Sequence, residues 1–220
     1  MRYNGLRLVI DMAVGRLADA RLQRYRDALV LGAIRADVDW QPGRSAIREH
    51  WSLSHFSGRW LAGGFIPFLT PDAPRVAQRH VDQAVAAWHA GEHARAFVLL
   101  GMASHLVIDM ACPVHASRVA HLTDGYEWYV EAHADALGTL PFAVPGGFAS
   151  ARAAADALAR LTRRFPPDRT NHHWGRLLKR LGLRRALTRD AVANQASHLI
   201  PAAAGHLAAI YTLFLEATRP

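Results

Sequence analysis

The sequence predicts an all-α protein, and three features of its 220 residues support this. Alanine and leucine dominate whereas β-branched residues are sparse, which favours helices over strands. Apolar residues recur at helical spacing almost from one end to the other. No segment alternates between apolar and polar residues for long, as half-buried strands do. The hydrophobic share of 51% is large enough to build a substantial core.

The predicted elements follow one another with proline and glycine signals between them. In chain order, the expected helices are 6–16, 22–31, 47–60 (helix or turn), 71–88, 92–110, 124–137, 150–164, 174–181, 188–196 and 199–217. Gly32 is expected to end the second helix, with an extended loop at 34–40, and Pro113 to end the central one. Residues 141–147 form a linker, and there is no internal repeat. We therefore expect one helical domain spanning residues 1–220.

The charge balance suggests anionic partners. The formal net charge is +8 and the isoelectric point is near 10.7, which favours contact with phosphate groups, nucleic acid or acidic membranes. Lys179 is the only lysine, so an arginine-rich, alanine-rich composition of a GC-rich gene explains the charge equally well. Arg163–Arg164 and the basic run 176–189 form either a phosphate-facing stripe or a solvated face.

Cysteine content and apolar segments bear on the compartment. The single cysteine, Cys112, excludes an intrachain disulfide. Residues 1–14 lack a secretory pattern, because their apolar stretch is short and interrupted by Asp11. The apolar stretches 94–112 and 199–215 contain polar residues and are expected to be buried helices, not membrane spans. A soluble, cytoplasmic protein is the default expectation.

The central helix carries ionisable residues in an apolar setting. Residues 94–110 are apolar on almost every side, so this helix belongs in the protein interior. His105 and Asp109 are four residues apart and share one face. An unpaired carboxylate there would cost on the order of several kcal/mol, so Asp109 must be paired, protonated or bound to a metal. The alternative to a metal site is a His105–Asp109 hydrogen bond that serves only the core.

The neighbouring segments favour a metal site. Pro113 breaks the helix one turn past Asp109, so the chain can fold back and bring His115 close. Other candidate donors are Asp37 and His55 upstream and the pair Glu127 and Glu131 downstream, at i and i+4. Imidazole nitrogen and carboxylate oxygen are the ligands that zinc takes where thiolates are lacking. We expect a site that leaves positions open for water.

These motifs resemble the zinc-dependent phospholipase C and single-strand-specific nuclease superfamily. The resemblance covers residues 32–135. Its motifs are Gly32–Asp37, Ser54-His55-Phe56, Ala87-Trp88-His89-Ala90-Gly91, Leu100-Gly101, His105-x-x-x-Asp109, Pro113-Val114-His115-Ala116 and Gly125-Tyr126-Glu127-x-x-x-Glu131. It implies an all-helical fold of the phospholipase C type and hydrolysis of phospholipids or nucleic acids at phosphorus.

The resemblance also implies two zinc ions. The first would be held by Asp37, His55, His105 and Asp109, and the second by His115, Glu131 and the residue one turn before it, Glu127. Glu127 stands where the family usually has histidine, so His121 or His133 could complete the second site instead. A third zinc site is expected to be missing, because the family's N-terminal tryptophan and early histidine are replaced by Met1 and Gly5-Leu6-Arg7.

The expected mechanism is metal-assisted hydrolysis, in which two zinc ions share and deprotonate a water that attacks phosphorus in line. Asp37 is expected to orient this water or accept its proton. Arg7 or Arg35 would stabilise the leaving group, and Phe56 would line the substrate pocket unless it serves packing. Lipid with membrane-surface contact and single-stranded nucleic acid both remain open as substrates. So does a degenerate, metal-binding domain without catalysis, and the sequence does not indicate an oligomeric state.

Overall fold

The computed structural model describes residues 1–36, 55–58, 72–119, 124–170, 173–182 and 186–219. The helices are α1 (Tyr3–Leu17), α2 (Ala20–Arg24), α3 (Arg26–Arg35), α5 (Ala73–His89), α6 (His93–Asp109), α7 (Pro113–Ala116), α8 (Gly125–Ala132), α9 (Ala134–Gly138), α10 (Ala151–Thr162), α11 (His173–Arg180) and α12 (Arg189–Ala217). No strand occurs among these described ranges, and the all-α prediction is confirmed.

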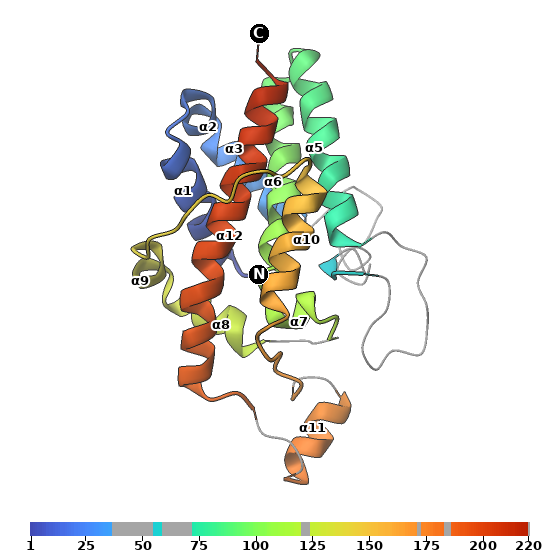
Figure 1. Cartoon of the computed structure of the whole chain (residues 1–220), viewed down its shortest axis with the longest axis vertical. Helices are drawn as coiled ribbons and strands as arrows, with labels where there is room; N and C mark the ends of the chain where they lie inside the picture. The colour runs from blue at the N-terminus through green and yellow to red at the C-terminus, as the bar shows by residue number, and fades with distance from the viewer. Residues whose placement is uncertain (37–54, 59–71, 120–123, 171–172, 183–185, 220) are drawn as a thin grey trace.

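Helix α6 lies in the middle of the bundle. It packs mainly against α3 and α5 and also contacts α1 and α12, while α10 packs against α5 and α12 (Figure 1). Phe97, Leu100 and Ile108 of α6 are fully buried, as expected for a helix that is apolar on nearly every side. The predicted central helix is thus confirmed, and its C-terminal end points into the lower half of the molecule.

The prediction that Gly32 ends the second helix is wrong. Gly32 lies inside α3, which continues to Arg35, so residues 34 and 35, expected in an extended loop, are helical; residues 37–40 of that expected loop lie outside the described residues. A Cβ atom on Gly32 would lie 2.0 Å from the carbonyl oxygen of Val98, and one on Gly101 would lie 2.1 Å from that of Leu29. The glycines therefore allow the backbones of α3 and α6 to touch, and neither serves as a helix stop.

Two other predicted helices are divided. Residues 22–31 fall into α2 and α3, separated by Tyr25, whose ring stacks on Phe97 with centroids 4.7 Å apart. Residues 124–137 fall into α8 and α9, which meet at His133. Asp72, Asp124, Ser150 and Thr188 cap α5, α8, α10 and α12 by accepting backbone N–H groups. The segment predicted as helix or turn at 47–60 lies mostly outside the described residues, apart from a short turn at His55.

The last two predicted helices are one continuous helix, α12, with Pro201 inside it. Proline removes one helical hydrogen bond and costs about 3 kcal/mol. Fully buried side chains on both sides of Pro201, such as Leu199 and Leu207, pack into the same core, and this burial offsets the cost. Among the described residues, α12 alone is long and apolar enough to cross a membrane, yet 61% of its most apolar window is buried inside the fold.

We predict that Gly32→Ala destabilises the protein by about 2 kcal/mol or more, because its Cβ would overlap the backbone of α6. The measurement is the free energy of unfolding in urea. Gly15→Ala, in α1, is the matched control, because nothing lies within 4 Å of its added Cβ. That control should gain about 0.5–1 kcal/mol from the better helix former. Equal stability changes in the two variants would contradict the close approach of α3 and α6.

Candidate metal centre

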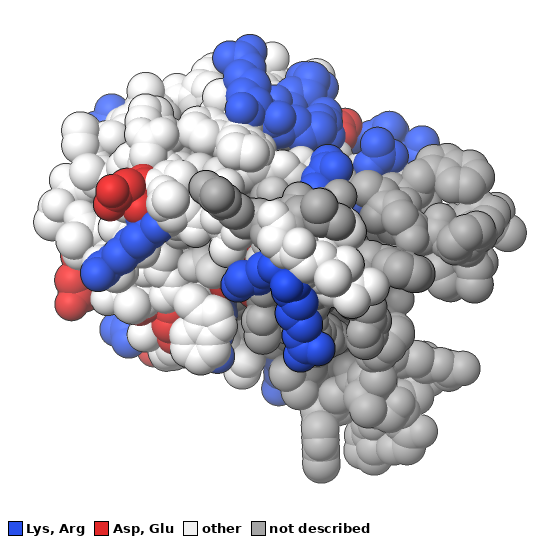
Figure 2. All heavy atoms as spheres, turned by 90° about the horizontal axis from the view of Figure 1, so that it is seen from below, with Lys and Arg blue, Asp and Glu red and all other residues white. Residues whose placement is uncertain are grey.

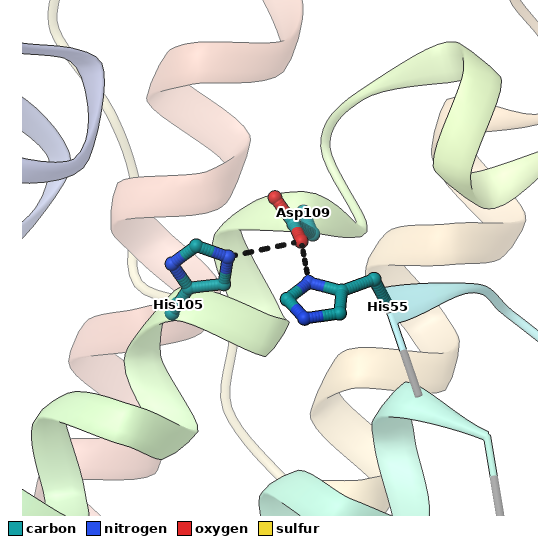
Figure 3. Close-up of side chains that lie close together, drawn as sticks. All are labelled: His55, His105 and Asp109. Atoms are coloured by element: carbon teal, nitrogen blue, oxygen red, sulfur yellow. Dashed lines mark hydrogen bonds and ion pairs between the residues drawn. The ribbon is translucent and has the colours of Figure 1, made fainter. Parts of the chain in front are cut away.

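Asp109, the last residue of α6, is completely buried and is surrounded by nitrogen groups. Its Oδ1 lies 2.8 Å from the amino nitrogen of Met1, and its Oδ2 lies 2.8 Å from Nδ1 of His55 and 3.2 Å from Nε2 of His105. His115 Nδ1 follows at 3.9 Å. Figure 3 shows His55 and His105 converging on the Asp109 carboxylate from different segments. The predicted His105–Asp109 pair thus lies within a larger cluster.

Hydrogen bonds fix the protonation of two imidazoles. His105 Nδ1 lies 2.8 Å from the carbonyl oxygen of Ala33 in α3, and His115 Nδ1 lies 3.0 Å from that of His55. A carbonyl oxygen can only accept a hydrogen bond, so Nδ1 carries a proton in both rings. Nε2 is therefore the nitrogen that can bind a second proton or a metal. A ligating histidine in proteins typically donates its other N–H to a carbonyl or carboxylate in this way.

The two Nε2 atoms face carboxylate oxygens. His105 Nε2 is 3.2 Å from Asp109, and His115 Nε2 is 3.5 Å from Oε1 of Glu127. A nitrogen lone pair and a carboxylate oxygen repel each other at this range, so a proton or a metal cation must lie between them. The donor set of buried imidazole nitrogens and carboxylate oxygens is the one zinc accepts. The residues present therefore fit a zinc ion.

The local sequence explains how His115 returns to α6. Pro113 cannot continue α6 and starts the short helix α7 at its first position, after a tight turn through Met110–Cys112. His115 lies on α7 and is buried, with 6% of its surface exposed. Helix α8 then begins at Gly125 because the Asp124 side chain accepts the N–H of Tyr126. Glu127, in the first turn of α8, thereby comes close to His115.

Segment 55–58 is held by three elements. The Ser57 N–H donates to the carbonyl of His115 at 3.3 Å, and the Ala73 N–H at the start of α5 donates to Phe56 at 3.0 Å. From the segment that follows α10, Arg163 donates to the Ser57 hydroxyl at 2.9 Å. The Phe56 ring stacks on His115 with centroids 5.2 Å apart, so packing is one of its uses. These contacts fix His55 against Asp109.

Possible ligand atoms form two groups. One is His55, His105 and Asp109, and the other is Cys112, His115 and Glu127, with the ligand atoms of each group within 4.8 Å of one another. Cys112 was not predicted as a site residue, because one cysteine in a sequence carries no metal signature. Its buried thiol donates to Asp124 at 3.1 Å. Only the fold shows that it lies beside His115.

The amino group of Met1 was also missed by the sequence analysis. It lies 2.8 Å from Asp109 and 2.9 Å from Oε1 of Glu127, between two carboxylates. The absence of an N-terminal tryptophan had suggested that this part of the family site is missing. An amino nitrogen is itself a possible metal donor once deprotonated. The expected number of two zinc ions therefore stays a prediction.

Glu131 is engaged elsewhere, although it lies one turn after Glu127 on α8. Its Oε2 accepts the N–H groups of Asn4 at 2.8 Å and Gly5 at 3.4 Å, and so it caps the first turn of α1. A carboxylate at this end of a helix is also favoured by the helix dipole. It does not belong to either of the two groups within the described residues, and its role as a zinc ligand stays a prediction.

The remaining predicted residues lie outside the cluster or outside the described residues. Asp37 and His121 fall outside the described ranges. His133, which follows the last residue of α8, bonds the carbonyl of Tyr129 in that helix at 2.8 Å. Arg7 lines a polar pocket of about 370 Å³ together with Asp11, Glu131 and Asp135, a pocket to which none of the clustered residues contributes. Arg35 is exposed at the end of α3. The structure thus brings neither arginine to the cluster.

Electrostatics keep the two central carboxylates ionised. Burial raises the pKa of Asp109, but the Met1 ammonium and the imidazoles of His115 and His105 outweigh it and hold that pKa well below its usual value. The pKa of Glu127 is also lowered. Burial alone would raise it, but the Met1 ammonium and His115 lower it by more. Burial lowers the pKa of His115, whereas Asp109 and Glu127 raise it to above its ordinary value. Positive and negative groups therefore stabilise each other here.

The neighbouring acidic groups behave differently. Burial raises the pKa of Asp124 to about 6, although the bond from Cys112 works against this. Burial, with the charges of Asp124 and Glu127, raises the pKa of the Cys112 thiol well above its ordinary value. Without a bound metal Cys112 is a thiol, and a bound metal would favour the thiolate.

Comparisons with known proteins identify the family and the fold. Residues 7–180 match the model of the family described as "Zinc dependent phospholipase C", and the chain belongs to this family. The fold is similar to that of the alpha toxin from Clostridium absonum, with a TM-score of 0.69 and 16% identity, covering 100% of this chain and 66% of that one. It is also similar to the Clostridium perfringens alpha-toxin isolated from avian strain SWCP, with a TM-score of 0.62 and 14% identity, covering 98% of this chain and 63% of that one. No curated protein matches.

These comparisons confirm the sequence-based resemblance and the predicted fold class. The chain spans about two thirds of the length of the solved structures it resembles, 66% and 63%. At these identities the likeness to them is one of fold.

We predict that the metal-free protein loses stability in acid and that Glu127→Gln reduces this loss by about 2 kcal/mol. The pKa of Glu127 is lowered in the folded state, so its stabilisation is complete above about pH 5 and is lost as the pH falls through that lowered pKa. The free energy of unfolding, measured in chelator from about pH 7 to pH 2.5, tests this. Glu216→Gln, on the exposed end of α12, is the control, because it removes the same charge away from the cluster. Parallel profiles for Glu127→Gln and the wild type would rule out the ion pair with Met1.

Proposed function

We propose that the chain is a zinc-dependent hydrolase of phosphodiesters, with phospholipids as the main substrate class. The observation that carries this is the buried Asp109 carboxylate with imidazoles turned toward it. A closed structural zinc site usually takes four protein ligands, often thiolates. A group of two histidines and one aspartate instead matches sites that keep a position for water or substrate.

The first zinc would be held by His55, His105 and Asp109, with Asp37 as a further ligand by family resemblance. A zinc ion bound there would supply a water with its pKa lowered to about 7 and a positive charge for phosphoryl oxygens. The chain supplies the rest. Ala33 and the surrounding core hold the His105 ring in one orientation, and α7 and α10 hold the turn that carries His55. Burial keeps bulk water from the carboxylate.

The second zinc would be held by His115 and Glu127, with Glu131 or Cys112 as the third protein ligand. Glu131 is the family's ligand by position, whereas Cys112 is the one within 4.8 Å of the other two. Cobalt in place of zinc distinguishes them, because a thiolate ligand gives an intense near-ultraviolet charge-transfer band and a carboxylate does not. Loss of the band in Cys112→Ser would assign it to Cys112.

The family favours lipid over nucleic acid. The matched family is named for phospholipase C, and the similar solved structures are alpha-toxins. Phe56 is half-buried and stacked on His115, so it offers an apolar surface for the substrate. We propose that it lies under the substrate next to the second metal position. Asp37 remains our candidate for orienting the attacking water.

We predict that the zinc-loaded protein hydrolyses a nitrophenyl phosphodiester and loses this activity in chelator. His55→Ala and His105→Ala should each lower kcat about a hundredfold or more, because each removes an orienting metal ligand. Elemental analysis should find two zinc ions per wild-type chain and fewer in both variants. The control is His198→Ala, because this exposed histidine of α12 lies outside the cluster and its ring bonds Asn194 and Ser197 of the same helix.

Three results would change the conclusion. Two tightly bound zinc ions without turnover would show a non-catalytic metal domain. Faster hydrolysis of single-stranded oligonucleotides than of phospholipid would show a nuclease. Full activity in chelator would remove zinc from the reaction.

A further inference from the structure

Helix α11 exposes an apolar stripe. It projects from the lower end of the molecule, beyond α7 and α8, and is separate from the bundle (Figure 1). Leu177 is 44% exposed and Leu181, just past the helix, is 61% exposed. They are four residues apart and therefore lie on one face. Leu178, beside them, is half-buried.

Positive charge surrounds this stripe. Lys179 and Arg180 are exposed in the last turn of α11. Arg164 and Arg169 before the helix and Arg189 after it are also exposed. In the sequence from 161 to 189, Asp168 is the one acidic residue. Figure 2 views this end and shows Lys and Arg side chains spread across it, with the larger patches of Asp and Glu toward its left-hand edge.

The helix is seated on a fixed loop. A Cβ atom on Gly175 would lie 1.9 Å from the carbonyl oxygen of Arg169, so the backbone of α11 rests directly on this loop. The loop is held by Asp168, whose carboxylate accepts the N–H of Thr170 at 2.8 Å and its hydroxyl at 2.7 Å. Because that side of α11 is covered at Gly175, the exposed leucines face outward as part of a defined surface.

A further exposed apolar group belongs to α8, which lies, like α11, in the lower half of the molecule (Figure 1). Trp128 of α8 is 53% exposed, and the guanidinium of Arg2 lies over its ring, 3.3 Å from the centroid. An indole beside a cation suits the boundary between lipid headgroups and acyl chains. Helix α8 also carries Glu127, so Trp128 directly follows a residue of the candidate metal centre.

We propose that α11, with Leu181 and the surrounding arginines, docks the protein on an anionic lipid bilayer. Leucines flanked by cations fit a bilayer, where phosphates meet the cations and the acyl boundary accepts the apolar side chains. Nucleic acid would meet the cations but offers no apolar layer for two leucines. This inference rests on the proposed function for its purpose, which is to hold the metal centre close to phospholipid. Docking itself is measurable without turnover.

The test is flotation of the zinc-loaded protein with vesicles of phosphatidylcholine containing phosphatidylglycerol. Leu177→Ser/Leu181→Ser should lower partitioning about tenfold, because two apolar side chains no longer enter the interface. Lys179→Glu/Arg180→Glu should lower it on anionic vesicles, with a loss that shrinks at high salt. Leu31→Ser is the matched control, an exposed leucine of α3 at 43%, and should bind like the wild type.

Two readouts separate docking from a general loss of structure or of the proposed function. Thermal unfolding and hydrolysis of the soluble nitrophenyl ester should be unchanged in the α11 variants. Vesicle binding with no hydrolysis by the wild type would refute the proposed function and leave docking in place. Equal vesicle binding by the wild type and the double leucine variant would overturn the docking proposal. So would tighter binding to a single-stranded oligonucleotide that the leucine variant retains and the charge variant loses.

Discussion

One buried negative charge organises this protein. Asp109 is fully enclosed, and an isolated carboxylate in such a place would lose far more hydration energy than folding can supply. It is stable because positive or proton-donating groups meet it from four parts of the chain: the Met1 amine, His55, His105 and His115. The same arrangement suits a divalent cation, which would neutralise the carboxylates more completely than protons do.

The scaffold around this charge holds the imidazoles in fixed orientations. Backbone contact between α3 and α6 at Gly32 and Gly101 brings the Ala33 carbonyl to His105. On the other side, two hydrogen bonds join His115 to the segment that begins at His55: the His115 ring donates to the His55 carbonyl, and the His115 carbonyl accepts from the Ser57 N–H. Ring nitrogens fixed in this way need no reorganisation to bind a metal, which is how rigid sites gain affinity.

The metal centre and the basic, partly apolar surface lie toward the same end of the molecule. Helices α7 and α8 carry His115 and Glu127, and α11 lies just beyond them in Figure 1. A protein that acts on a lipid headgroup must bring its reactive groups to the surface of the bilayer without entering the bilayer deeply. An apolar stripe with flanking cations near the site provides such an approach.

Local sequence patterns determined most of the helices and half of the site. The 3.6-residue repeat places His105 and Asp109 on one face, and Pro113 forces the turn that returns His115, so these three could be found without coordinates. Gly32 was misinterpreted as a helix end, and the break predicted between residues 196 and 199 does not occur, because local propensity is weaker than packing against the core.

Only the tertiary structure decided which groups complete the cluster. The Met1 amine meets Asp109 across 108 residues, and Cys112 and Glu131 acquire their neighbours through α8 and α1. No periodicity encodes such contacts, since they depend on how whole helices pack. The sequence alone therefore determined the helices and the ionisable pair in the core, and three-dimensional packing selected the charges that stabilise that pair.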